Sequence, residues 1–268
     1  MKCPFGRSAF AALWLSASLA GCATVEQPDP LEKLNRKVFA FNETVDEYVI
    51  APPARAYRKV VPSMVRLGVD NFFNNLRDVW SAVNLVLQGR LDASASDVMR
   101  FGTNTVLGLG GFVDWASELG LEPHYEDFGQ TLGVWGFNAG AYLVLPILGP
   151  SSVRDAIGLP ADILASPDQI ADTVRLRNSL TGLRIINTRA GLLDATGLLD
   201  DIALDKYSFV RDAYLQRRRS LVEDGKRHGA AAEEDYIPPE PAAAASAAVP
   251  AASEPLAPAS SPAADGKP

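Results

Sequence analysis

The chain has 268 residues, with 25 Lys and Arg against 32 Asp and Glu, and a formal net charge of −7. Loss of an N-terminal segment that contains Lys2 and Arg7 would leave 23 basic and 32 acidic residues, a net charge of −9. Such an acidic protein is a poor match for the phosphate backbone, so we expect no nucleic-acid partner. Cys3 lies in the same segment, which leaves one cysteine and therefore neither an internal disulfide nor a thiolate zinc site.

Residues 1–21 have the order of a secretory signal peptide. Basic residues precede an apolar stretch from Ala9 to Leu19, which as a helix of about 16 Å is too short for a hydrocarbon core of about 30 Å. Leu19-Ala20-Gly21-Cys22 follows and resembles the lipobox of bacterial lipoproteins. We therefore predict cleavage before Cys22 and lipidation of Cys22 by more than one acyl chain, which anchors a protein stably. The alternative is a plain signal peptide followed by a chance cysteine.

The rest of the chain divides into three predicted parts. Residues 22–30 form a lipidated linker, and residues 31–228 are long enough for one helical domain with its own core. Residues 229–268 are rich in Ala, Pro, Ser and Glu and hold too few large apolar side chains to offset the entropy of ordering, which predicts a disordered tail. The tail is either a spacer or a periplasmic contact, or, as the composition favours, a dispensable solvated segment.

The domain is predicted to be all-α. Apolar residues recur at three- and four-residue spacing in several segments, which is typical of amphipathic helices. These segments run from Leu31 to Val49, ending at Pro52 and Pro53; from Pro62 and Ser63 to a stop at Gly89; from about Ala93 to Leu107; and from Ser166 and Pro167 to about Asp224, with breaks near Gly191 or Gly197. Between Leu107 and Gly149 many glycines and Pro146 allow only short or broken elements.

The chemistry of catalysis is thinly represented. Downstream of the signal the only histidines are His124 and His228, and His124 lies in the acidic stretch Glu122–Asp127. A metal or acid–base role for His124 is conceivable, but a solvated acidic loop explains this stretch equally well. Neither the dinucleotide fingerprint nor a GxxxxGK[ST] phosphate loop is present. We therefore expect no enzyme activity, cofactor or metal.

Two further features have alternative explanations. The cluster Arg217–Arg219 is interpreted as cations favoured near a helix end, with a contact to an anionic lipid or partner as the alternative. The apolar helix faces either pack into the core of a water-soluble bundle or lie in a membrane interface, because no body segment has 18 consecutive apolar residues. The spacing alone favours the water-soluble bundle.

Several motifs, in order, make the chain resemble the VacJ/MlaA family of outer-membrane lipoproteins. They are Asp29-Pro30-Leu31-Glu32 with Asn35-Arg36 and Phe41-Asn42; Phe101-Gly102-Thr103-Asn104-Thr105 with Gly108 to Asp114; Phe128-Gly129-Gln130-Thr131-Leu132-Gly133; Leu145-Pro146 with Gly149-Pro150-Ser151 and Arg154-Asp155; and Thr188-Arg189-Ala190 with Leu192-Leu193-Asp194. Together they cover about Asp29 to Arg218. In such lipoproteins an aspartate after the lipidated cysteine usually means inner-membrane retention, so Ala23 indicates the outer membrane.

The resemblance implies a function and a set of partners. It implies a ring-like assembly of amphipathic and broken helices in one leaflet of the outer membrane, facing the periplasm, with a central amphipathic channel. Members remove mislocalised phospholipids from the outer leaflet, bind trimeric porins, and pass the lipid to a soluble periplasmic carrier that feeds an ATP-driven inner-membrane complex. The family thus reverses the preference for a water-soluble bundle. The alternative function is a structural or adaptor lipoprotein that associates with porins without moving lipid.

Candidate site residues follow from these implications. The helix with Phe41 and Asn42 is the candidate gate. The candidate channel and membrane wall is the broken segment from Leu107 to Gly149, since irregular backbone at membrane depth is tolerated where it lines a wet cavity. Its candidate residues are Gly108, Gly110, Gly111, Gly129, Gly133 and Pro146.

Overall fold

The computed structural model describes residues 29–234, most of which are helical. Cys22, the signal segment and the tail beyond Glu234 lie outside the described residues. The first half contains α2 (Glu32–Val45), the π-helix η1 (Asp46–Ile50), α3 (Ala51–Val60), α4 (Ser63–Leu87) and α5 (Leu91–Val106). The second half contains α6 (Trp115–Glu118), α7 (Phe128–Val134), β1 (Tyr142–Leu145), β2 (Gly149–Ser152), α8 (Val153–Leu164), the 3₁₀ helix η2 (Pro167–Ile170), α9 (Val174–Ile202) and α10 (Lys206–Glu234).

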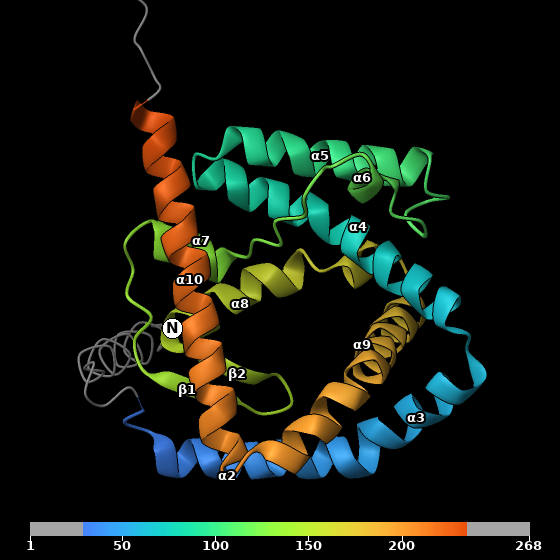
Figure 1. Ribbon diagram of the computed structural model, residues 1–268, viewed down its shortest axis with the longest axis vertical. Coiled ribbons are helices and arrows are strands. Elements are labelled where there is room, and N and C mark those ends of the chain that lie inside the picture. Colours follow the sequence, from blue (N-terminus) through green and yellow to red (C-terminus); the bar gives the residue numbers. More distant parts are fainter. Residues whose placement is uncertain (1–28, 235–268) are drawn as a thin grey trace, which may run out of the picture. The chain divides into compact units, whose positions relative to one another are not determined.

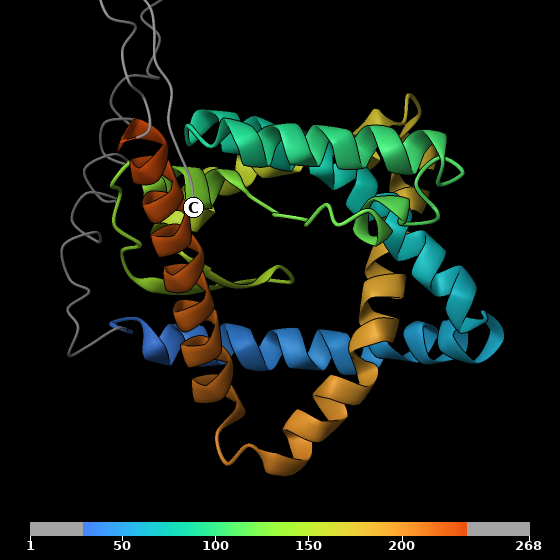
Figure 2. The same cartoon turned by 45° about the horizontal axis from the view of Figure 1, so that its top comes forward.

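The elements contact one another in a closed circuit, which Figures 1 and 2 show from two directions. α2 continues through η1 into α3, α3 packs against α9, and α9 also contacts α4. α4 packs along α5 and touches α7; α7 packs on α8 and α10; α10 contacts β2, and β1 returns to α2. The predicted helical, ring-like fold is therefore confirmed. Across residues 29–234, none of the helices combines the length and the hydropathy needed to cross a bilayer.

The first predicted helix does not stop at Pro52 and Pro53, so this boundary was wrong. η1 adds one wide turn after α2, and α3 then begins at Ala51 with the two prolines in its first turn. Proline is tolerated there because the first N–H groups of a helix have no intrahelical acceptor. α4 and α5, by contrast, match their predicted segments, and Gly89 follows α4 with a φ of 78°.

The glycine-rich segment contains short elements, as predicted, but two of them are strands. β1 and β2 form an antiparallel hairpin in which Tyr142 pairs with Ser152 and Leu145 with Gly149. Tyr142 is fully buried and packs with Val144 and Tyr207 of α10. This small sheet is the one departure from an all-α fold in the described residues, and alternation of buried and half-buried residues over only four positions did not reveal it.

The later helices differ from their predicted bounds. Pro167 opens only a 3₁₀ turn, and α9 starts at Val174, capped by the Thr173 hydroxyl. α9 runs unbroken through Gly191 and Gly197, because a glycine within a helix costs only about 1 kcal/mol relative to alanine. The predicted start of the tail at residue 229 falls inside α10, whose last residues are the strong helix formers alanine and glutamate.

Arg218, predicted to lie near a helix end, instead lies within α10 and joins two other helices. Its guanidinium pairs with Asp127, the N-cap of α7, at 2.5 and 2.9 Å, and with Asp155 of α8 at 2.8 and 3.0 Å. The Tyr214 hydroxyl donates to Asp155 at 2.5 Å. Burial opposes the charged form of Arg218, but the two carboxylates hold its pKa above the usual value. Neither sequence interpretation of the arginine cluster included this role.

Polar and apolar side chains are distributed in an unusual way. Large apolar side chains are widely exposed, for example Val60 and Met64 at 81% and Val106 at 79%. Charged and amide side chains such as Asp97 and Asn84 are fully buried. This differs from the water-soluble bundle that spacing alone favoured, because soluble proteins rarely expose large contiguous apolar patches.

Arg100 on α5 lies at the centre of one buried polar cluster. Its Nη2 donates to Asp114 at 3.2 and 3.3 Å, and its Nε lies 3.4 Å from Oδ2 of Asp78 on α4. Asn104 also donates to Asp114, at 2.9 Å. Burial raises the pKa of Asp78 to about 7, an effect that Arg100 opposes and Asp97 strengthens.

The raised pKa of Asp78 predicts a specific pH dependence of stability. The carboxyl of Asp78 has a pKa near the ordinary value of 3.8 in the unfolded chain and of about 7 in the folded chain. Between these two pH values the unfolded chain has already lost the proton, so the folded state loses stability relative to the unfolded state as the pH rises. Asp78→Asn removes the titration. We expect the melting temperature of the wild type to fall relative to that of D78N between about pH 5 and about pH 7.5, measured by circular dichroism. Asp172→Asn, at an exposed position, is the control; parallel curves for wild type and D78N would contradict the prediction.

Candidate functional site

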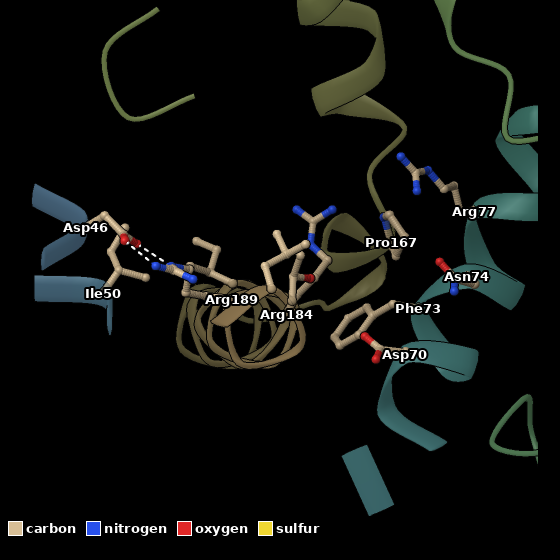
Figure 3. A pocket seen from close by; sticks show the side chains of 12 residues that line it. Asp46, Ile50, Asp70, Phe73, Asn74, Arg77, Pro167, Arg184 and Arg189 are labelled. Carbon is tan, nitrogen blue, oxygen red and sulfur yellow. Dashed lines mark hydrogen bonds and ion pairs between the residues drawn. The ribbon is translucent and has the colours of Figure 1, made fainter. Parts of the chain in front are cut away.

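The main candidate site is a cavity of about 450 Å³ between η1, α4, η2 and α9, hereafter the arginine cavity (Figure 3). Its residues come from regular helical stripes. On α4 the lining residues have the spacing i, i+3, i+4 and i+7. On α9 they form two neighbouring rows in which successive residues are four positions apart, one from Arg184 to Leu192 and one from Ile185 to Arg189. The lining residues are Asp46, Ile50, Asp70, Phe73, Asn74, Arg77, Pro167, Arg184, Ile185, Thr188, Arg189 and Leu192.

Three arginines and two aspartates give the cavity its charge. Arg189 of α9 is bound by Asp46 of η1 through two hydrogen bonds of 2.7 Å, so these two charges neutralise each other (Figure 3). Arg77 stacks its guanidinium 5.5 Å from the centre of the Tyr125 ring, and within residues 29–234 it forms no ion pair with a carboxylate. In Figure 3 the Arg184 side chain lies between Arg189 and Pro167.

Apolar side chains share the cavity with these cations. Ile50, Phe73, Ile185 and Leu192 line it, and Phe73 is among the few large apolar side chains that are buried. A guanidinium binds phosphate and carboxylate oxygens with paired hydrogen bonds, and apolar walls accept hydrocarbon. The arrangement therefore suits an amphipathic anion, with a charged group and an apolar body, better than a small polar metabolite.

Asn187 fixes the helices around one side of the cavity. The Tyr57 hydroxyl of α3 donates to Asn187 Oδ1 at 2.7 Å, and Asn187 Nδ2 donates to Asp70 of α4 at 2.6 Å. Burial raises the pKa of Asp70, although the bond from Asn187 and the charge of Arg66 oppose this. Burial, assisted by Asp70, also raises the pKa of Tyr57, which therefore stays a donor at neutral pH. Three helices are thus joined through one buried amide.

The predicted gate residues lie on α2 and are not among the residues that line the arginine cavity. Phe41 is half exposed. Asn42 binds the turn of the hairpin: its Nδ2 donates to the Leu145 carbonyl at 2.9 Å, and its Oδ1 accepts the Ile147 N–H at 2.7 Å. Ile147 has a φ of 66°, which is unfavourable for a β-branched residue, so the turn is both strained and held by Asn42.

Three of the candidate wall residues shape a turn after α5. Gly110 and Gly111 have φ values of 75° and 97°, and a side chain at Gly111 would come within 2.7 Å of Asn75 Nδ2. Gly108 packs against backbone oxygens of Asn104 and Val113, so it has no space for a Cβ. These glycines are required by backbone conformation and close approach.

The other wall candidates are also accounted for by packing or by a turn. A Cβ at Gly129 would meet Asp155 at 2.6 Å, and one at Gly133 would meet Arg154 and Val222 at 2.7 Å. Both glycines therefore let α7 approach α8 and α10. Pro146 is exposed in the hairpin turn. None of the six candidates lines the arginine cavity, so their role in a channel stays a prediction.

Sequence reasoning missed the arginines of the cavity. Arg189 is part of a motif that carried the family resemblance, but no role was assigned to it, and Arg77 and Arg184 were not singled out. Charged residues on long helices usually indicate a solvated face, so spacing alone gave no signal for a shared cavity. His124, which the sequence suggested as a weak catalytic candidate, pairs through Nδ1 with Oδ1 of buried Asp97 at 2.8 Å.

Comparisons with known proteins agree with one another. The model of the MlaA lipoprotein family matches residues 27–221. The chain is 39% identical to the intermembrane phospholipid transport system lipoprotein MlaA of Escherichia coli, over 78% of this chain and 86% of that protein. It is 33% identical to the MlaA of Haemophilus influenzae, over 80% and 90%.

A solved structure is also similar. It comes from work on the structural basis for maintenance of bacterial outer membrane lipid asymmetry, and it is 38% identical to this chain. The match has a TM-score of 0.62 and covers 72% of this chain and 98% of the solved one.

The contacts of Asn42 predict a local effect of its replacement. Asn42→Ala removes two hydrogen bonds, each worth about 1 kcal/mol, from a strained turn. We expect faster amide hydrogen exchange in residues 142–152, measured by mass spectrometry, with little change in exchange of α4. Thr44→Ala is the matched control, because the Thr44 hydroxyl bonds only to the Ala40 carbonyl of its own helix. Equal exchange in both variants would show that Asn42 does not hold the hairpin.

Proposed function

The chain belongs to the MlaA lipoprotein family, and we propose that it removes mislocalised phospholipids from the outer leaflet of the outer membrane and passes them toward the periplasm. The observation that carries this proposal is the arginine cavity, which combines guanidinium groups with apolar walls. Two named relatives are intermembrane phospholipid transport lipoproteins, which supports the same substrate class.

The physical problem in such transport is the headgroup. A phosphate cannot enter hydrocarbon without losing its hydrogen bonds, and each unpaired polar group there costs several kcal/mol. Arg77 and Arg184 would replace water as donors to the phosphate oxygens, while Phe73 and Ile185 would contact the acyl region. The cavity would lower the cost of transfer without covalent chemistry.

The position of the protein in the envelope is part of the proposal. Lipidated Cys22 would tether the chain to the outer membrane, facing the periplasm. The exposed apolar side chains of α4 and α5 would lie in the acyl region of one leaflet, an environment in which their exposure has no cost. A channel through the ring, walled in part by the glycine-rich segment, would give the headgroup its route.

The remaining partners follow from the family resemblance. These are a trimeric porin, and a soluble periplasmic carrier that delivers lipid to an ATP-driven inner-membrane complex. An energy source elsewhere fits the lack of a nucleotide-binding loop in this sequence. We keep Phe41 and Asn42 as the proposed gate, now with a physical basis: Asn42 binds a strained hairpin turn whose release would be a discrete change of state.

The cavity arginines provide the direct test of the transport function. In cells lacking the gene, complementation with Arg77→Gln/Arg184→Gln should leave outer-leaflet phospholipid near the level of the deletion, measured by labelling specific to the outer leaflet. Loss of two charge-assisted hydrogen bonds of about 1.5–3 kcal/mol each would weaken binding at least about 100-fold. The matched control is Arg58→Gln/Arg175→Gln, which removes two arginines outside the cavity and should complement fully.

Normal outer-leaflet phospholipid in the cavity variant, at equal expression, would exclude the arginine cavity from transport. If the deletion itself caused no rise in outer-leaflet phospholipid, the adaptor function would be favoured instead. Porin association does not separate the two functions, because both predict it.

A second prediction concerns the anchor. Cys22→Ala should produce an exported protein without acyl chains, which we expect to be released from the outer membrane and to fail to complement the deletion. Membrane fractionation together with the outer-leaflet labelling measures both effects. Full complementation by a soluble C22A protein would show that the anchor is dispensable.

A further inference from the structure

A groove of about 550 Å³ lies beside the arginine cavity, between α4, α5 and the end of α8, and is hereafter the apolar groove. Its wall is mostly apolar, with Ser166 and Gln169 as the polar residues of the lining. It is lined by Leu76, Val79, Trp80 and Val83 of α4, Phe101 of α5 and Leu164 of α8.

The apolar groove and the arginine cavity adjoin each other along α4. Residues 70, 73, 74 and 77 line the cavity, whereas 76, 79, 80 and 83 line the groove, and each set has the i, i+3, i+4, i+7 spacing of one helical stripe. The two sets are offset by six residues, so the centres of the stripes are about 120° apart around the axis. Their edges adjoin, because Phe73 and Trp80 are seven residues and therefore only about 20° apart. Pro167 lines both spaces (Figure 3).

The wall of the groove is held in place and is accessible. The Trp80 Nε1 donates to Asp162 Oδ1 of α8 at 2.8 Å, which satisfies the indole N–H and leaves the ring for apolar contact. Val79 and Val83 are 45% and 43% exposed. An occupant would therefore bury mainly apolar surface and leave the hydrogen bond of the Trp80 indole intact.

We propose that the apolar groove binds one acyl chain of the phospholipid whose phosphate lies among Arg77 and Arg184. This inference rests on the proposed function and adds the orientation of the substrate: the headgroup lies on the η1 side of Pro167 and the acyl chain on the α8 side. An acyl chain fits better than a segment of a partner protein, because the groove is continuous with a space that suits an anionic headgroup, and a phospholipid joins these two chemistries covalently.

Filling the groove tests the proposal. The Val83→Trp variant places a large ring in the groove, whereas Met99→Trp on α5 adds the same ring at an exposed position, 59% accessible, outside the groove. Met99 lies about 200° around α5 from Phe101. Phospholipid retained per protein after purification is measured by mass spectrometry. We expect V83W to retain roughly tenfold less than wild type, since displacing even about two methylenes has such an effect, and M99W to retain the wild-type amount.

A second measurement covers the case in which V83W fails to fold. A benzophenone photocrosslinker replaces Val79 or, as control, Met99, in otherwise wild-type protein and in protein carrying Arg77→Gln/Arg184→Gln. Crosslinking of phospholipid at position 79 should fall when the arginines are lost, while crosslinking at position 99 should not change, because bulk membrane lipid does not depend on the cavity.

The outcomes separate the two proposals. The acyl-chain assignment would be overturned if folded V83W retained the wild-type amount of lipid, or if crosslinking at position 79 did not change when the arginines are replaced. Either result would leave the transport function intact. A crosslink from position 79 to a protein would likewise overturn it in favour of a partner segment. Absence of phospholipid from the wild type itself would count against the proposed function, and with it the inference.

Discussion

Pairing of buried charges is the constraint on which the described fold depends. With few large apolar side chains buried, the helices are joined by contacts such as Arg218 of α10 with Asp155 of α8, and Arg100 of α5 with Asp78 of α4. A buried ion loses the solvation of water and becomes strongly destabilising if its partner is removed, so each contact specifies one arrangement of helices. The arrangement of α4, α7, α8 and α10 is therefore fixed more by the geometry of their hydrogen bonds than by the packing of an apolar core.

The same constraint distinguishes Arg77 of the arginine cavity from the arginines that are held in ion pairs. Arg218 and Arg189 are bound by carboxylates in paired geometry, which is the arrangement of a structural ion pair. Arg77 instead stacks on the Tyr125 ring, which orients a guanidinium and leaves its N–H groups directed elsewhere. A cation positioned by an aromatic ring can exchange water for an anionic ligand without first breaking an ion pair.

Much of the fold could be predicted from the sequence, but the direction of its faces could not. Helical spacing, Pro62 and Gly89 gave the bounds of α4 closely, and ordered motifs gave the family. α8 was missed because Gly158 and Pro160 suggest a break, although an N-cap at Ser152 starts the helix. Periodicity shows which residues share one face of a helix. Whether the apolar face packs inward or is exposed depends on whether water or lipid surrounds the protein.

The candidate site shows the same division. The motif around Phe41 and Asn42 was identified, but the role of Asn42 became definable only with the hairpin, whose strands are too short to be detected by alternation. The glycines were predicted to wall a channel because irregular backbone at membrane depth is tolerated beside a wet cavity, and this stays a prediction. In the structure Gly111 has a positive φ, and Gly133 allows close helix packing. Residues that must be glycine for backbone reasons carry no information about what a cavity binds.

α4 connects these observations, because one rigid helix presents three different environments. Its buried stripe, with Asp78 and Leu85, packs against α5, a second stripe with Arg77 faces the arginine cavity, and a third with Val79 and Val83 faces the apolar groove. In a helix of 25 residues the offsets between these stripes are fixed by the 100° turn per residue. A ligand spanning the cavity and the groove would therefore be oriented by α4 alone, while the polar stripe holds α4 in the ring. A rotation of α4 that moved Arg77 out of the cavity would also expose Asp78 and break its contact with Arg100, so the ion pair in the interior stabilises the orientation of the proposed lipid site.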